Sequence, residues 1–394
     1  MHSFRDALDL LLKHTSPLPA ERVRIEVAAG RVLRQDIRTD RDFPPYDRVM
    51  MDGFALRSGD LLGGRVFNIS GQAPAGRETA VIPDHPASCL EVMTGAPLPQ
   101  GADCIVPVEE IQRTGSDEIT IAPGFEHAAG RFIHARGSDA REGNLLLEPG
   151  VLLGSREIGV AASCGAAWLE VSRNANITVL STGDELVAVD ETPAPHQIRQ
   201  SNAHAIRCAL ERSGHPPNHV GTLADDPDAA RDVLGERISA SDFLVLTGAI
   251  SKGARDFIPA LLDALGCTKV FHGVAQRPGK PAGCWIGPAG QVIVALPGNP
   301  VSALTGLHAF VLPALAVASG SPMPKPRLVI PGGRMEGLPG MTQHLPVTIG
   351  ADVRVQAAPT GNSGDFIGLL KSDGFVTLPP RGEIAAALPF TPWL

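Results

Sequence analysis

Polar loops that follow predicted strands hold most of the residues in this sequence that could do chemistry. Five short apolar runs between residues 177 and 296 predict strands, and helical runs alternate with them, as in a doubly wound, mostly parallel sheet. Ligands of such sheets bind beyond the carboxyl ends of the strands, so we expect these loops to share one rim. The polar segments are residues 182–185, 224–226, 248–256, 276–281 and 297–302.

The expected rim combines acidic side chains with two cations, Arg277 and Lys280. Hard divalent ions prefer carboxylate oxygens, while lysine and arginine bind phosphate and other oxyanions. This set therefore predicts a site for a phosphate-bearing substrate together with a divalent metal ion. The acidic residues are Asp184, Glu185, Asp225, Asp226 and Asp256.

Several of these residues also have a purely structural interpretation. Asp226 stands before Pro227, which is typical of a helix N-cap, and Asp256 is equally able to cap the next helix. Lys280 lacks the spacing of a phosphate-binding P-loop, and Asn299 lies between two prolines, as in many turns. The recurrence of polar residues at one end of the sheet favours the functional interpretation.

Composition and missing motifs disfavour several other functions. The net charge of −8 argues against a nucleic-acid-binding surface. The sequence has no H-E-x-x-H pair, no G-x-S-x-G elbow and no G-x-G-x-x-G after a strand, which disfavours zinc proteases, α/β-hydrolases and dehydrogenases. Its cysteines are never spaced C-x-x-C and no secretory signal is visible, so we expect reduced thiols in a cytoplasmic chain. Residues 281–324 are uncharged, but glycine and proline interrupt them, which predicts buried elements rather than a membrane span.

The rest of the sequence predicts elements of other kinds. Ser3 and Asp6 form a capping-box pattern ahead of an amphipathic helix. From about residue 41 to residue 140, short alternating runs separated by proline and glycine predict a β-rich, inserted region. The turn-rich tail that follows the linker at residues 319–326 predicts a small β-domain.

Four segments of this chain form a distinctive set: Met51 to Arg57, Val92 to Asp103, Ser181 to Leu186, and Leu296 to Ser302. They resemble the signatures of the molybdopterin molybdenumtransferase family. Their order and spacing match those of the family over essentially the whole chain.

The resemblance implies a multidomain α/β plus β fold. It places a split helical N-terminal domain at residues 1–40 and 141–170, and a β-rich inserted domain at residues 41–140. A doubly wound α/β molybdopterin-binding domain would follow at residues 171–320, and a C-terminal β-domain at residues 321–394. The implied protein is a homodimer that shares its site between subunits. It inserts molybdate, a substrate, into adenylylated molybdopterin with loss of AMP, in a reaction that depends on Mg²⁺.

The resemblance also implies roles for individual residues. The implied catalytic residues are Asp52, Thr94, Asp139, Glu185 and Asp256, and the implied Mg²⁺ ligands are Glu185, Asp226 and Asp256. The implied substrate-binding residues are Thr182, Gly183, Asp184, Asp225, Ser251, Arg277, Lys280, Pro297, Gly298, Asn299, Pro300, Ser302 and Ser363.

The chain departs from the family pattern at a few positions. The family usually has glycine where Ala249 stands, and alanine with a positive φ would cost about 1 kcal/mol or more. The family often has serine and a small residue before Met51, where this chain has Val49 and Met50. In the last domain, Gln343 and His344 stand where arginine is often expected. Two alternatives stay open: a molybdopterin adenylyltransferase, which resembles the α/β domain alone, and a catalytically weak scaffold or binding paralogue.

Overall fold

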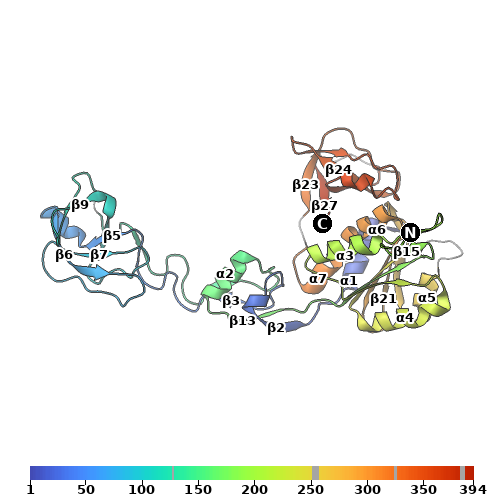
Figure 1. The fold of residues 1–394 in the computed structure, drawn as a ribbon, viewed down its shortest axis with the longest axis horizontal. Coiled ribbons are helices and arrows are strands. Elements are labelled where there is room, and N and C mark those ends of the chain that lie inside the picture. Colours follow the sequence, from blue (N-terminus) through green and yellow to red (C-terminus); the bar gives the residue numbers. More distant parts are fainter. Residues whose placement is uncertain (127, 251–256, 324–325, 382–386) are drawn as a thin grey trace. The chain divides into compact units, whose positions relative to one another are not determined.

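The computed structural model describes residues 1–126, 128–250, 257–323, 326–381 and 387–394 (Figure 1). The chain divides into two compact units. The first unit contains residues 1–35, 149–155 and 168–394, and the second contains residues 36–148 and 156–167.

A six-stranded sheet forms the centre of the first unit. Four strands run parallel and adjacent, and β21 is antiparallel to its neighbours β22 and β19. The edge strand β19 therefore points the same way as the first four, which confirms the predicted, mostly parallel sheet. The order is β17 (His219–Leu223), β14 (Ile177–Thr182), β18 (Phe243–Thr247), β22 (Val292–Leu296), β21 (Gly283–Ile286) and β19 (Thr268–His272).

Helices cover both faces of this sheet (Figure 1). Alternate side chains of a strand point to opposite faces, so Val179 lies in one apolar core and Leu180 in the other. The first core packs against α1 (Phe4–Lys13), α3 (Asn202–Arg212), α6 (Pro300–Gly306), the π-helical turn η4 (Leu307–Val311) and α7 (Leu312–Ser319). The second core packs against α4 (Pro227–Ala240) and α5 (Ile258–Ala264).

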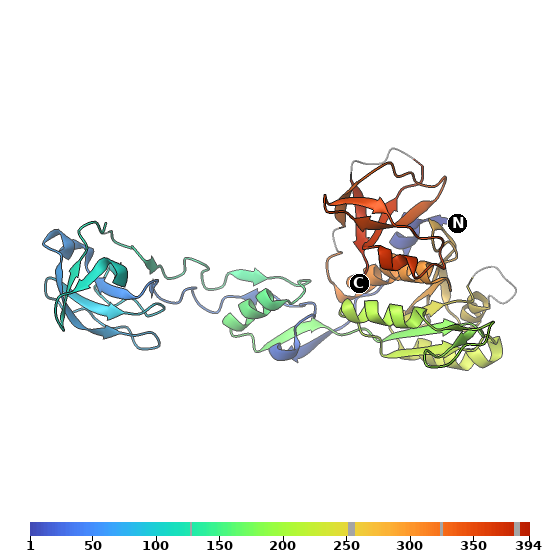
Figure 2. The same cartoon turned by 45° about the horizontal axis from the view of Figure 1, so that its top comes forward.

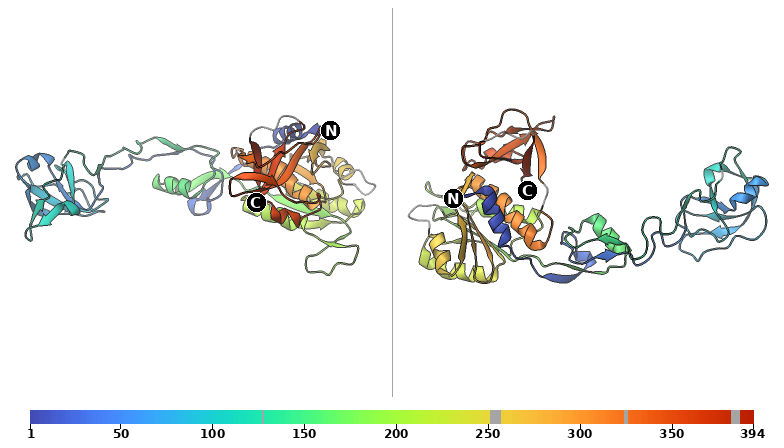
Figure 3. Two further views of the ribbon diagram at one scale, coloured as in Figure 1. Left: turned by 90° about the horizontal axis from the view of Figure 1, so that it is seen from above. Right: turned by 180° about the vertical axis from the view of Figure 1, so that it is seen from behind.

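Helix α1 belongs to this α/β core. Its N-cap Ser3 accepts a hydrogen bond from the backbone N–H of Asp6, as the capping pattern predicts. Ala7 and Leu11 are fully buried against the sheet, and α1 lies beside α7 (Figure 3). The sequence interpretation grouped this helix with residues 141–170, whereas its apolar stripe packs on the sheet instead.

The uncharged stretch predicted to be buried contains one continuous helix, Pro300 to Ser319. Its mean hydropathy of 1.8 and its length would suit a membrane span, but 72% of the apolar window is buried inside the protein. The helix therefore fits the core of a folded domain, where its side chains pack against the sheet.

The C-terminal part forms a second sheet, visible above the α/β layers in Figure 2. Five strands close into a ring because β24 pairs with both β25 and β26. Strands β1 (His2–Ser3) and β20 (Val274–Arg277) extend this sheet from β24. The ring contains β23 (Arg327–Pro331), β24 (Thr342–Ile349), β25 (Arg354–Ala357), β26 (Gly374–Leu378) and β27 (Leu388–Pro392).

Residues predicted as a split helical domain contain short strands as well as helices. Leu169 and Val171 alternate with exposed neighbours in β13 (Trp168–Ser172), which pairs with β2 (Ala20–Arg24) in the first unit. In the second unit, β3 (Ile37–Arg38) pairs with β12 (Leu145–Leu147). Only α1 and α2 (Ser155–Ser163) are α-helical in these ranges. Both helices that the sequence predicts in these ranges are present, and short strands lie beside them.

The second unit contains the predicted β-rich region. Its six-stranded sheet has the order β8 (Cys104–Pro107), β5 (Gly53–Leu56), β7 (Ser88–Val92), β6 (Val66–Ala73), β10 (Glu118–Ile121) and β9 (Ile111–Arg113). Phe54 and Phe67 lie in its core. A two-stranded ladder pairs β4 (Arg48–Val49) with β11 (Ile133–His134).

Candidate functional site

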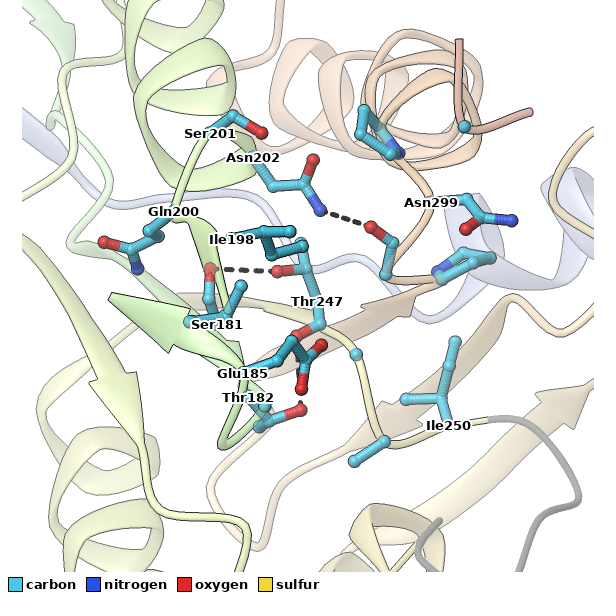
Figure 4. Close-up of a pocket in the computed structure, with 18 of the residues that line it drawn as sticks. Ser181, Thr182, Glu185, Ile198, Gln200, Ser201, Asn202, Thr247, Ile250 and Asn299 are labelled. Atoms are coloured by element: carbon cyan, nitrogen blue, oxygen red, sulfur yellow. Dashed lines mark hydrogen bonds between the residues drawn. The ribbon is translucent and has the colours of Figure 1, made fainter. Parts of the chain in front are cut away.

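A pocket of about 620 Å³ opens at the carboxyl ends of β14, β18 and β22 (Figure 4). Thr182, Thr247 and Pro297 stand at or directly after these strand ends. The lining residues are Ser181, Thr182, Gly183, Glu185, Leu186, Ile198, Arg199, Gln200, Ser201, Asn202, Asp225, Thr247, Gly248, Ala249, Ile250, Pro281, Pro297, Gly298, Asn299, Pro300 and Gly364.

Two helix N-termini open onto the pocket. Helix α3 begins at Asn202, and the long helix that starts with α6 begins at Pro300. The side-chain amide of Asn202 donates to the carbonyl oxygen of Gly298 at 2.7 Å and so links the two starts. The positive ends of the helix dipoles make such a place favourable for an anion.

Two acidic residues line the pocket from two loops. Glu185 is exposed, and a Cβ built on Gly183 would lie 2.8 Å from both Glu185 carboxylate oxygens. This carboxylate therefore lies directly against the backbone of the turn that follows β14. Asp225 lines the pocket from the loop after β17. The pair supplies hard oxygen donors of the kind that Mg²⁺ prefers, so the side chains present are compatible with that ion. Within the described part of the chain, no group of three or more metal-binding side chains is found.

The turn after β18 has left-handed backbone at two successive residues. Gly248 has φ of +95°, and a Cβ there would lie 2.6 Å from the carbonyl oxygen of Thr182. Ala249 has φ of +48°, the conformation for which the family's glycine is suited. This residue therefore carries local strain at the pocket wall.

Replacing Ala249 with glycine is expected to stabilise the protein slightly. The change relieves roughly 1 to 2 kcal/mol of left-handed strain and costs roughly 0.5 to 1 kcal/mol of backbone entropy. Gly248→Ala is the matched control and should destabilise the fold, because its Cβ meets fixed backbone. Denaturant midpoints of the two variants measure both effects. A lower midpoint for Ala249→Gly than for the unchanged chain would contradict this account.

Eight of the predicted site residues line the pocket: Thr182, Gly183, Glu185, Asp225, Pro297, Gly298, Asn299 and Pro300. Ser363 lies next to it, because Asn299 Nδ2 donates to Ser363 Oγ at 2.9 Å. Asp184 is exposed outside the lining, and Ser302 is buried in α6. Ser251 and Asp256 lie outside the described residues.

Three other predicted residues do not line the pocket. Asp226 is the N-cap of α4 and accepts from the backbone N–H of Ala229 at 2.8 Å, so the capping interpretation is confirmed. Arg277 ends strand β20 in the C-terminal sheet, and Lys280 is exposed beside the lining residue Pro281. Arg277 is held in the C-terminal sheet because β20 pairs with β24 instead of the α/β sheet, whereas Lys280 lies beyond β20 and directly precedes a residue of the lining.

Asp52, Thr94 and Asp139 lie in the second unit. Asp52 Oδ1 accepts from both the backbone N–H and the hydroxyl of Thr94, at 2.7 and 2.8 Å. These two hydrogen bonds hold the pKa of Asp52 below its usual range, and the bond from the backbone N–H has the larger effect. The carboxyl group therefore stays ionised at neutral pH. Asp139 Oδ1 contacts the ring of His134 at 2.7 Å.

The segment 198–202 was missed by the sequence interpretation. It places Arg199, Gln200 and Asn202 in the pocket, and Arg199 supplies a cation to the lining. The polar run Gln200-Ser201-Asn202 directly before an amphipathic helix was the available signal.

Comparison with known proteins gives the same picture over the whole chain. Residues 2–165 match the family described as MoeA N-terminal region (domain I and II), and residues 178–317 match the probable molybdopterin binding domain. A molybdopterin molybdenumtransferase of Synechocystis sp. is 34% identical over 401 residues, covering all of both chains. Its counterpart in Synechococcus elongatus is 36% identical over 79% of each chain.

Solved structures agree with these matches. The molybdopterin biosynthesis MoeA protein of Pyrococcus horikoshii superposes with a TM-score of 0.78 at 26% identity, over 98% of this chain and 96% of that one. Fold and site thus define a multidomain protein built around a molybdopterin-binding α/β domain. The chain belongs to the MoeA family of molybdopterin molybdenumtransferases.

Proposed function

We propose that this chain inserts molybdenum from molybdate into adenylylated molybdopterin and releases AMP. The observation that carries the proposal is the pocket, where two helix N-termini face two carboxylates, Glu185 and Asp225. This arrangement suits a phosphate-bearing ligand. Family membership supports the same reaction class.

Different residues of the pocket are proposed to bind the phosphate groups and the metal ion. The helix starts at Asn202 and Pro300 favour the anionic phosphate groups, and Arg199 adds a cation to the lining. Glu185 and Asp225 would hold Mg²⁺, with Asp256 as a further proposed ligand. Bound there, Mg²⁺ would neutralise the pyrophosphate and make the phosphorus more electrophilic. Asp226 is a weaker candidate because its Oδ1 already caps α4.

Activation of a molybdenum-cofactor-free molybdoenzyme tests this proposal. The mixture contains the chain, adenylylated molybdopterin, Mg²⁺ and molybdate at a concentration too low for uncatalysed insertion. Activation that requires every component supports the proposed reaction. Equal activation without the chain would contradict it.

Lys280→Ala is expected to raise the molybdate concentration needed for half-maximal conversion by about tenfold or more. The reason is loss of a charge-assisted interaction worth about 1.5 to 3 kcal/mol. Lys280 is exposed next to Pro281 of the lining, so its removal should leave the fold unchanged. The measurement is the initial rate against molybdate concentration.

Lys269→Ala is the matched control for that variant. Lys269 is an exposed lysine whose Nζ pairs with Asp263 at 3.2 Å, away from the pocket lining. Its replacement should leave the molybdate dependence unchanged. If the molybdate dependence of Lys280→Ala is also unchanged, Lys280 does not bind molybdate and is only a solvent-exposed residue.

We also infer that the protein works as a homodimer in which Asp52 and Thr94 of one subunit complete the partner's pocket. These residues belong to the second unit, whereas the pocket belongs to the first. Met50 and Met93 are 52% and 49% exposed beside them. Exposed methionines flanking an ordered carboxylate suit a surface that is covered in an assembly.

A further inference from the structure

His134 in the second unit contacts a cation and a carboxylate at the same time. Its Nδ1 lies 2.9 Å from Arg48 Nη2, and its Nε2 lies 2.7 Å from Asp139 Oδ1. The ladder between β4 and β11 creates this arrangement, because His134 and Arg48 are directly opposite partners in it.

The contact with Arg48 decides where the imidazole carries its proton. A guanidinium group only donates hydrogen bonds, so Nδ1 must accept and cannot carry a hydrogen. The ring is therefore in the Nε2–H form, and Nε2 donates to Asp139. A carboxylate that accepts this bond has one of its two oxygens fixed in direction.

Backbone hydrogen bonds fix the main chain from which this carboxylate projects. The N–H groups of Asp139 and Ala140 both donate to the carbonyl oxygen of Phe43, at 2.9 and 3.2 Å. The side chain of Asp139 is nevertheless 57% exposed, whereas that of His134 is 26% exposed. Asp139 thus presents an oriented carboxylate to solvent, with Oδ2 accepting no hydrogen bond from the described residues.

We propose that His134, fixed in its tautomer by Arg48, is the positioning residue that orients Asp139 for the transfer reaction. The proposal rests on the proposed function, together with the catalytic role that the family resemblance implies for Asp139. His134 itself does not contact substrate in this scheme. Its effect is transmitted entirely through the carboxylate of Asp139.

The first test is direct and needs no activity. Nitrogen NMR of the ¹⁵N-histidine-labelled full chain should show His134 with a protonated Nε2 and an unprotonated Nδ1. In Arg48→Met, Nε2 should stay protonated because Asp139 still accepts from it, while the ¹⁵N shift of Nδ1 should change because its hydrogen-bond donor is lost. A protonated Nδ1 in the unchanged chain, or no change in Arg48→Met, would overturn the proposal.

The second test uses the rate of AMP release. His134→Ala should lower the maximal rate about 10- to 100-fold with an unchanged half-saturating substrate concentration, as found for residues that orient a reactive group. His134→Gln should recover most of that rate, because its amide N–H can replace the Nε2 donor. Equal rates for His134→Ala and the unchanged chain would overturn the positioning role.

The variant Asp139→Asn distinguishes a failure of this proposal from a failure of the catalytic role of Asp139. If Asp139→Asn releases AMP at the normal rate, Asp139 has no catalytic role and that part of the proposed function fails, whatever the tautomer of His134. If Asp139→Asn is inactive while His134→Ala is fully active, the catalytic role of Asp139 is supported and His134 is not its positioning residue. A low rate in both, with recovery in His134→Gln, supports the proposal.

Discussion

Replacing Glu185 with glutamine is expected to lower the rate of AMP release by about 10² to 10³. The exposed carboxylate lies against the Gly183 turn at the pocket and is a proposed Mg²⁺ ligand. Losing a charged group that stabilises developing charge has effects of this size in other enzymes. Because Glu185 is exposed, the melting temperature should stay within about 2 °C.

Asp184→Asn is the matched control, because Asp184 is the exposed neighbour outside the pocket lining. It should keep most of the activity. Magnesium titration of each variant then separates metal binding from a general charge effect. A fully active Glu185→Gln would remove this residue from the mechanism and leave Asp225 as the described acidic candidate in the lining.

Mixing two inactive variants is expected to restore activity. Asp52→Ala damages the second unit and Glu185→Gln damages the pocket of the first. In a dimer with reciprocal shared sites, each heterodimer has one site with no lesion and one with both. Random refolding makes half of the dimers mixed, so about a quarter of the unchanged rate should return.

The control mixes Asp52→Ala with Thr94→Val. These two residues contact each other through the 2.8 Å hydrogen bond, so both lesions fall on the same side of the proposed interface. Every site then contains one lesion and no activity should return. Recovery in this control, or none in the first mixture despite verified heterodimers, would reject the shared site.

The sequence was sufficient to predict the α/β core and several of the loops that line its pocket. Runs such as Val292–Leu296 are short and apolar, and Pro297 to Pro300 follow directly, so both the strand and its functional loop are local patterns. The role of Asp226 was also predictable from its neighbours alone, since an aspartate before a proline is typical of a helix N-cap. The family was recognised from sequence signatures such as Met51-Asp52-Gly53 and residues 297–300. Hydrophobic periodicity alone would not have identified it.

What could not be predicted depends on pairing between distant segments. Strand β20 follows β19 in sequence but joins β24 of the C-terminal sheet, which takes Arg277 out of the expected rim. The contact between Arg48 and His134 spans 86 positions and exists only because β4 and β11 pair. Helix α1 was grouped with the wrong domain for a related reason. An amphipathic pattern shows that one face of a helix is buried, but it does not show which surface that face packs against.

AMP release by the purified chain tests the central claim most directly. Adenylylated molybdopterin is incubated with the chain, Mg²⁺ and increasing molybdate, and AMP and metal-bound pterin are quantified together. The account predicts AMP release that requires molybdate and equals the amount of molybdenum inserted, with no consumption of ATP. Binding of the adenylylated pterin without AMP release, or pyrophosphate formed from ATP and molybdopterin, would contradict it.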